Sequence, residues 1–161
     1  MIRSPHGARA VLAFTLAAVT AAACVRVAVQ RQPASGAANA AIHREIDLMM
    51  SASAAAWNRG DLDLFVSDYL PGQGTTFIGR RGVLRGVDAI RANYAARFAP
   101  GGQRDSLHFE QMEVDELAPN VANVIAWYVL QRGDSVTARG PTSLVMRKMN
   151  GRWRIVHDHS S

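Results

Sequence analysis

Two histidines near the end of the sequence are the most direct candidates for chemistry. His157 and His159 are two residues apart, and in a β-strand such residues project from the same face. An imidazole exchanges its proton near neutral pH, so the pair could serve as general base and general acid. Alternatively, both line the wall of a pocket, or neither takes part. Because strand ends fray, we expect His157 to be better buried than His159 and to make the stronger ligand contact.

The carboxylates near these histidines predict structural roles. Asp158 lies between the two histidines, so a regular strand would turn it to the opposite face, where it would form a cross-strand or dimer-face ion pair with an arginine. Asp68 lies beside Tyr69 and off the apolar stripe of a short helix, which predicts a solvated side chain. Neither carboxylate is therefore expected inside a pocket.

No sequence motif indicates a metal or a cofactor. A metal ion would need a third ligand beside the two histidines, and neither His43 nor His108 has a visible reason to converge on them. The sequence contains no phosphate-binding loop, no Gly-x-Ser-x-Gly elbow, no Cys-x-x-Cys pair and no dinucleotide fingerprint. We therefore expect chemistry that uses no metal and no cofactor.

The first residues have the pattern of an export signal. Arg3 and Arg9 precede fourteen uncharged, mostly apolar residues, fewer than the roughly 20 that span a bilayer. Small residues at 21–23 then lead directly to Cys24, the only cysteine. This arrangement resembles a bacterial lipoprotein box and predicts a signal peptide over 1–23 with lipidation of Cys24. Simple signal cleavage, an uncleaved anchor and a buried free thiol are the alternatives.

Composition limits the class of protein. The 161 residues are 48% hydrophobic and 19% charged, which excludes wholesale disorder. The net charge of +5 is scattered, and the only dense basic group, Arg80, Arg81 and Arg85, lies among glycines. Nucleic-acid binding would need a clustered basic face, so none is expected. Residues 24–40, rich in Ala, Gln, Pro, Ser and Gly, predict a flexible linker before a domain over 41–161.

Periodicity predicts three helices followed by strands. Apolar residues at helical spacing indicate helices over 41–58, over a short segment ending near Tyr69, and over 87–99, with a small hairpin over 75–85. Four long strands follow, with a bulge near Glu110, a kink at Gly140-Pro141 and a tight turn at Asn150-Gly151. Helices segregated to one face of a curved antiparallel sheet define an α+β fold.

The strand over 121–131 is apolar on both faces. Ile125, Trp127 and Val129 face one way, and Ala126, Tyr128 and Leu130 face the other. If one face covers the helices, the face bearing Ala126, Tyr128 and Leu130 needs another cover. The sequence therefore predicts a homodimer formed through the sheet.

Three strings carry a resemblance to a known family. The element order and these strings resemble the nuclear transport factor 2-like superfamily, in its SnoaL-like and domain-of-unknown-function-4440 branch. The ending also looks like the last strand of the calcium/calmodulin-dependent kinase II association domain. The likeness covers about 42–161, and the strings are AWNRGD at 56–61, GVDAIR at 86–91 and NGRWRIVHDHSS at 150–161.

The resemblance implies a cone, three helices on a curved sheet, enclosing a hydrophobic pocket. Aromatic residues expected at its mouth as ligand contacts, together with His157, are Trp57, Tyr69, Tyr94 and Trp127. Steroid isomerases of this superfamily use an early acid and a tyrosine–acid pair, and neither is recognisable here by spacing.

Two functions remain open. The first is an exported, membrane-anchored or secreted domain that binds a small apolar or amphipathic ligand. It either only binds the ligand or also transfers protons as an isomerase, cyclase or dehydratase. The second is a non-catalytic homodimerising interaction module. The fold alone does not decide between them.

Overall fold

The structure is a computed structural model that describes residues 36–161. The predictions for the signal peptide, for Cys24 and for most of the linker concern residues outside this range. Within it, none of the helices has the length and apolar character needed to cross a bilayer.

The first helix, α1, spans Gly36–Arg59 and begins before Ala41, so the last residues of the expected linker are helical. Ile46, Met50, Ser53 and Trp57 recur every three or four residues and are all buried, which gives the helix one face against the sheet. The helix ends at Gly60, whose φ of +82° is readily adopted by glycine. This stripe places Trp57 at the end of the helix where the chain turns.

Two further helices follow α1, with a small β-hairpin between them. The helix α2 spans Leu62–Val66, and the Asp61 side chain caps it by accepting a hydrogen bond from the Leu64 amide at 2.9 Å. Strands β1 (Thr76–Gly79) and β2 (Gly82–Arg85) form the predicted small hairpin. The helix α3 then spans Val87–Phe98, directly after Gly86.

The rest of the domain is the predicted meander. Its strands are β3 (Ser106–Ala118), β4 (Val121–Arg132), β5 (Ser135–Met149) and β6 (Arg152–Ser160). Asn150 and Gly151 join the last two strands with φ values of +52° and +75°. Both values are positive, as in the type I′ turn that an Asn-Gly pair favours.

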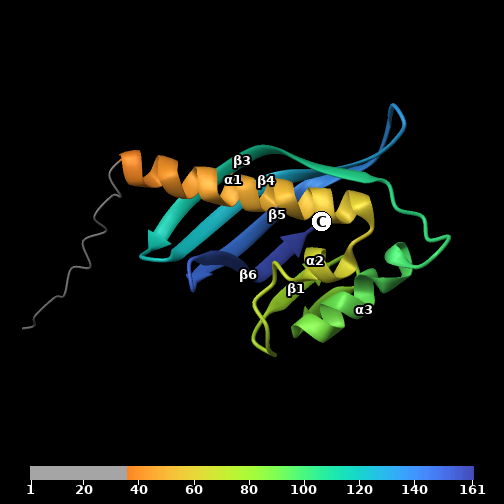
Figure 1. Ribbon diagram of the computed structural model, residues 1–161, viewed down its shortest axis with the longest axis horizontal. Helices are drawn as coiled ribbons and strands as arrows, with labels where there is room; N and C mark the ends of the chain where they lie inside the picture. The colour runs from red at the N-terminus through yellow and green to blue at the C-terminus, as the bar shows by residue number, and fades with distance from the viewer. Residues whose placement is uncertain (1–35) are drawn as a thin grey trace, which may run out of the picture. The chain divides into compact units, whose positions relative to one another are not determined.

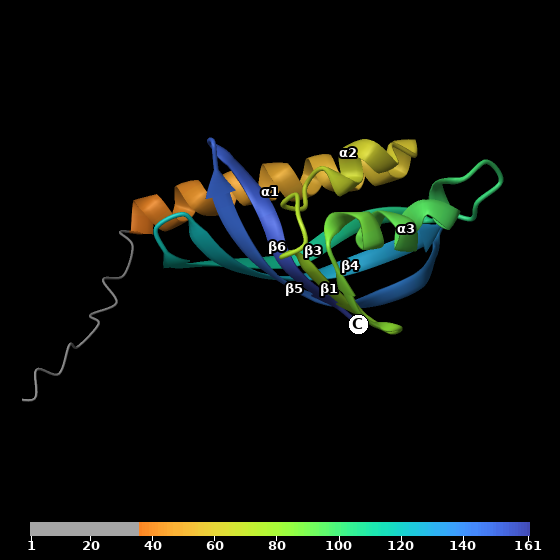
Figure 2. The same cartoon turned by 90° about the horizontal axis from the view of Figure 1, so that it is seen from below.

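All six strands form one sheet in the order β2-β1-β6-β5-β4-β3. Neighbours are antiparallel except β1 and β6, which run parallel and join the small hairpin to the meander. Figure 1 shows α1 lying along the sheet, and Figure 2 shows all three helices on one side of the curved sheet. This is the α+β architecture expected from the sequence.

The ladder has several register shifts, and two of them, in β3 and β6, matter for the site. In β3 the register shifts between Glu110 and Glu113, and Gln111 has a φ of +52°, which confirms the bulge predicted there. In β6 Val156 is the extra residue, because Val145 pairs with His157 while Met146 pairs with Ile155. No local sequence pattern predicts this second bulge.

At Gly140-Pro141, where a kink is expected, both residues keep their register with β4. The register shift of β5 lies between Val136 and Ala138. Gly140 is nevertheless needed for close packing, because a Cβ there would lie 1.9 Å from the Ser161 carbonyl oxygen.

Candidate functional site

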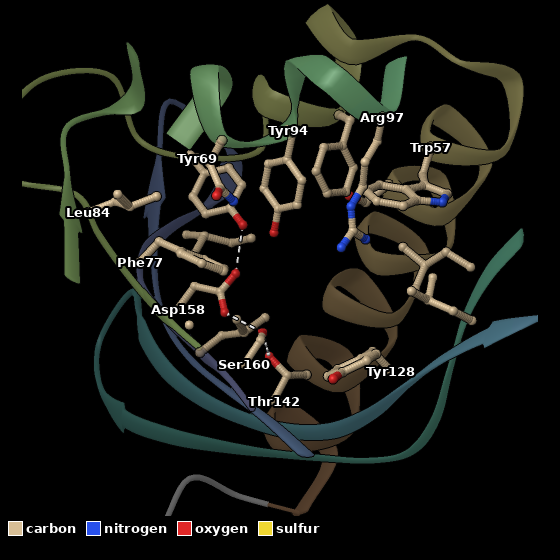
Figure 3. Close-up of a pocket in the computed structure, with 18 of the residues that line it drawn as sticks. Trp57, Tyr69, Phe77, Leu84, Tyr94, Arg97, Tyr128, Thr142, Asp158 and Ser160 are labelled. Carbon is tan, nitrogen blue, oxygen red and sulfur yellow. Dashed lines mark hydrogen bonds between the residues drawn. The ribbon is translucent and has the colours of Figure 1, made fainter. Parts of the chain in front are cut away.

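A cavity of about 430 Å³ opens between the sheet and the helices. Ligand pockets commonly measure about 300–1,000 Å³, so the cavity has the size for a small molecule. Figure 3 shows aromatic side chains from the helices on one side and a row of oxygen-bearing side chains from the sheet on the other. Aromatic and aliphatic side chains supply most of the wall, together with hydroxyl groups, one carboxyl group and three arginines.

The polar centre of the wall is a tyrosine–acid pair. The Tyr69 hydroxyl donates a hydrogen bond of 2.6 Å to Asp158 Oδ2, and both residues are buried. The two residues are 89 positions apart in the sequence, so no local spacing reveals them. The structure thus contains a tyrosine–acid pair that the sequence analysis did not recognise.

Two hydroxyls extend this pair along the sheet. Ser160 Oγ donates to Asp158 Oδ1 at 2.7 Å, and Thr142 Oγ1 lies 2.9 Å from Ser160 Oγ. Because Ser160 gives its single proton to Asp158, Thr142 must be the donor to Ser160. The chain of hydroxyls holds the Asp158 carboxylate in one orientation (Figure 3).

Burial governs the protonation of this group. Removal from water raises the pKa of Asp158, and the hydrogen bonds from Tyr69 and Ser160 only partly oppose that shift. Burial also raises the pKa of the Tyr69 and Tyr94 hydroxyls, so both stay protonated near neutral pH. The site therefore combines a carboxyl group that is more basic than usual with two neutral hydroxyl donors.

Backbone pairing brings Tyr69 to Asp158. The segment after α2 forms a short parallel bridge to β6, in which the Leu70 amide donates to the Ile155 carbonyl and the Ile155 amide donates to the Asp68 carbonyl, both at 2.8 Å. Beyond Ile155 the partner of β6 changes to β1, beginning at Thr76 opposite His157. The Val156 bulge falls at this change of partner.

The bulge also reverses the faces of the last strand. Ile155 faces the pocket, and after the extra residue Asp158 and Ser160 face it in turn. His157 and His159 do not line the pocket, so the expectation that they share its face is wrong. The expected arginine pair of Asp158 is also wrong, since its hydrogen-bond partners are hydroxyls.

The histidines lie on the other side of the sheet. His157 is half-buried, and its Nδ1 lies 2.6 Å from Thr76 Oγ1 on the neighbouring strand. His159 is exposed, so the expected order of burial within the pair is confirmed. Neither histidine is therefore placed to touch a ligand inside the cavity.

Three of the four predicted aromatic contacts line the cavity: Trp57, Tyr69 and Tyr94. Trp57 packs edge-on against Tyr94 at 5.8 Å between ring centroids, and its indole nitrogen donates outward to the Asp105 carbonyl at 2.8 Å. The Tyr94 hydroxyl points into the cavity (Figure 3). Trp57 thus supplies apolar surface, whereas Tyr94 also supplies a donor.

Trp127 is on the opposite face of β4, so its expected pocket contact is wrong. The Arg139 guanidinium covers its ring at 4.4 Å. Tyr128 and Leu130 line the cavity instead, and Ala126 is fully buried. The face that the sequence analysis left to a dimer partner is therefore the face that covers the helices.

Asp68 is not solvated as predicted. Its side chain is 8% exposed, and burial raises its pKa against a hydrogen bond from Ser53 and the charges of Arg154 and Arg152. Ser53 lines the cavity, but Asp68 does not. Asp68 thus lies behind Ser53, outside the cavity lining.

Within the described part of the chain, no three His, Cys, Asp or Glu side chains gather closely enough to hold a metal ion. The cavity wall itself contains one carboxyl group and no histidine or cysteine. What the arrangement provides is a buried proton acceptor, hydroxyl donors and an apolar chamber.

This geometry agrees with the family to which the sequence belongs. Residues 46–161 match the SnoaL-like domain family, so the chain belongs to that family, and its fold is that of the nuclear transport factor 2-like superfamily. No curated protein matches the sequence significantly. The family and fold expected from the strings at 56–61, 86–91 and 150–161 are confirmed.

Solved structures share the fold. One is a nuclear transport factor 2-like protein of unknown function from Shewanella oneidensis, 27% identical with a TM-score of 0.68, covering 74% of this chain and 98% of its own. Another is a superfamily member from Salmonella enterica, 22% identical with a TM-score of 0.60, covering 76% and 91%. A third is a proposed scytalone dehydratase from Novosphingobium aromaticivorans, 14% identical with a TM-score of 0.63, covering 76% and 84%.

Proposed function

We propose that the protein binds a small, mostly apolar ligand in this cavity and transfers a proton to or from it through Asp158. The observation that carries the proposal is the position of Asp158, a buried carboxyl group that faces the cavity without a cationic side chain bonded to it. A carboxylate whose pKa is raised toward neutrality is a better base than one in water. The reaction class is isomerisation, cyclisation or dehydration.

The surrounding residues have separate tasks. Tyr69 and Ser160 orient the Asp158 carboxylate, because each donates to a different oxygen of it. The Tyr94 hydroxyl, which points into the cavity, would donate to an oxygen on which negative charge develops. Trp57, Phe65 and Phe77 supply the dry surface that strengthens these interactions.

Deuterium exchange tests the proposal. The apolar ketone 2-tetralone has acidic hydrogens at C1, whose exchange in D₂O can be followed by proton NMR. The protein should accelerate that exchange, and Asp158→Asn should reduce the acceleration by about 10²–10⁴-fold, the usual contribution of a positioned base. His159→Asn, an exposed residue on the other face, is the matched control. Equal rates in Asp158→Asn and wild type would refute Asp158 as the base.

A homodimeric interaction module is the second candidate, and the outer face of the sheet favours it. Ile125 is 42% exposed there, beside the half-buried Trp127. A partner copy would cover this face, which is opposite to the face first expected to pair. Sedimentation of the chain at tens of micromolar tests the assembly, and Ile125→Lys should weaken it.

Export belongs to the proposal as well. A signal peptide over 1–23 and a lipid anchor on Cys24 would place the domain outside the cytoplasm on a membrane, and cleavage without lipidation would make it secreted or periplasmic. Fatty-acid labelling distinguishes the two, because Cys24→Ser should abolish the label only in the first case.

A further inference from the structure

The residues that line the cavity have an excess of positive charge. Arg97, in the last turn of α3, and Arg80 and Arg81, in the turn between β1 and β2, are all among its lining residues. Asp158 is the only acid in the same lining. Figure 3 shows the Arg97 guanidinium pointing into the cavity beside Tyr94 and Trp57.

These arginines lack bonded counter-ions. Within residues 36–161, the ion pairs are those of Arg91, His108, Arg132, Arg139 and Lys148, so none includes a cavity arginine. The acid whose charge Arg97 feels is Asp105, but its oxygens already bond Arg132 at 2.7 Å and Thr137 at 2.6 Å.

Arg97 is exposed and lies over an aromatic ring. Its guanidinium lies 5.8 Å from the centre of the Trp57 ring, which limits its freedom without neutralising its charge. Burial raises the pKa of Tyr94, and the charge of Arg97 partly opposes that rise, so the two groups are electrostatic neighbours.

We infer that the ligand is an amphipathic organic acid, whose carboxylate binds Arg97 while its apolar body reaches between the aromatic rings toward Asp158. This inference rests on the proposed function and adds the substrate class. A planar guanidinium matches a carboxylate with two parallel hydrogen bonds. Arg80 and Arg81 at the cavity's edge would draw the anion in by their field.

The positions of the charges also set the orientation of the ligand. The carboxylate would be repelled by an ionised Asp158, so it must bind at the Arg97 end. The reacting carbon or hydroxyl then lies at the other end, near Asp158 and the Tyr94 hydroxyl. A neutral ligand of the same shape would leave Arg97 without a partner in the complex.

Calorimetry with two matched probes tests this inference on the full-length chain. The probes are 2-naphthylacetate and its neutral counterpart 2-naphthylacetamide. We expect the acid to bind at least about tenfold tighter, since hydrogen bonds between ionised groups are roughly twice as strong as neutral ones. The preference should weaken as salt is raised, because the cavity is open to solvent.

Substitutions test whether Arg97 is the source of the preference for the acid over the amide. Arg97→Met keeps much of the apolar stem and should remove the preference, whereas Arg97→Lys should keep part of it. Arg85→Met is the control, since Arg85 is exposed on the same hairpin as Arg80 but does not line the cavity. Circular dichroism checks that each variant is folded.

Each outcome has one meaning. Equal affinity of wild type for both probes, or an unchanged ratio in Arg97→Met, would overturn the inference and leave ligand binding intact. Failure of both probes to bind would refute the ligand-binding function itself. Preference for the acid without 2-tetralone exchange would support the inference and contradict the proton-transfer step.

Discussion

The two faces of β6 differ in every property that matters for chemistry. On the inner face, Asp158 and Ser160 line the cavity, and burial raises the pKa of the Asp158 carboxyl. On the outer face, His157 contacts Thr76 and His159 is exposed to water. An imidazole exchanges protons near neutral pH more readily than an ordinary carboxylate does. Only the Asp158 carboxylate, however, lies in the cavity. Location in the cavity determines which group can react, because a group that does not reach the ligand cannot exchange a proton with it.

One extra residue creates this difference. Without the bulge at Val156, alternation from Ile155 would place His157 and His159 in the cavity and Asp158 outside. The bulge lies where the partner of β6 changes from the segment around Tyr69 to β1. The backbone pairing that places Tyr69 beside β6 thus ends at the bulge that turns Asp158 toward Tyr69.

A bulky side chain on the inner face of β6 should affect ligand binding far more than one on the outer face. Ser160→Trp would place an indole in the cavity and should reduce binding of 2-tetralone by roughly 100-fold, equivalent to about 2.7 kcal/mol. His159→Trp, one residue away on the outer face, should change binding less than about twofold. Calorimetry on both variants measures this. Loss of binding in His159→Trp alone would mean that the faces are reversed.

Removing the Tyr69 hydroxyl tests its contribution on the inner face of β6. Tyr69→Phe leaves the buried Asp158 carboxylate without its 2.6 Å donor, which should cost about 1–3 kcal/mol of unfolding free energy and slow 2-tetralone exchange about tenfold. Tyr128→Phe is the comparison, since that hydroxyl donates to the Ser161 carbonyl instead. Urea unfolding and the exchange assay together give both effects. A similar loss in both variants would contradict a special role for Tyr69.

The stability of the protein should depend on pH through Asp158. Because burial raises the pKa of this carboxyl in the folded state, its contribution to stability is complete below the unfolded-state pKa. That contribution is lost as pH rises through the folded-state pKa. Asp158→Asn removes the titration, so the stability of wild type relative to the variant should fall as pH rises from 4 to 8. Thermal unfolding across this range measures it, and a constant difference would contradict the raised pKa.

The smallest effects are expected on the outer face. His157→Ala should lose about 1 kcal/mol of stability through its contact with Thr76, and His159→Ala should lose less than about 0.5 kcal/mol. Neither should slow 2-tetralone exchange more than about twofold. A large loss of exchange in His157→Ala, with folding intact, would restore the histidine as a catalytic residue.

Local patterns predicted the helices and most of the strands, but not all of the strand pairing. The stripe through Ile46, Met50 and Trp57, the Asn150-Gly151 turn and the change of parity around Gln111 each depend on neighbouring residues, and all appear in the structure. The parallel pairing of β1 with β6 joins segments about 80 positions apart, and no local signal marks it. The same holds for the tyrosine–acid pair.

The site was therefore predicted only in part. Trp57, Tyr69 and Tyr94 line the cavity because helical spacing and the turn after α2 fix their directions. On the strands, the expectations for Trp127, His157 and Asp158 failed because they depend on which face of a strand is inside. Alternation gives two faces, but only contacts from distant segments and the bulge they impose select between them.

The most direct test of the account is a carbon-13 NMR titration of the Asp158 carboxyl, assigned by its absence in Asp158→Asn. The account predicts that this carboxyl titrates above the usual aspartate range and that its signal shifts when 2-naphthylacetate or 2-tetralone is added. Titration in the usual range, with no response to either molecule, would show that Asp158 faces water, and the central claim would be wrong.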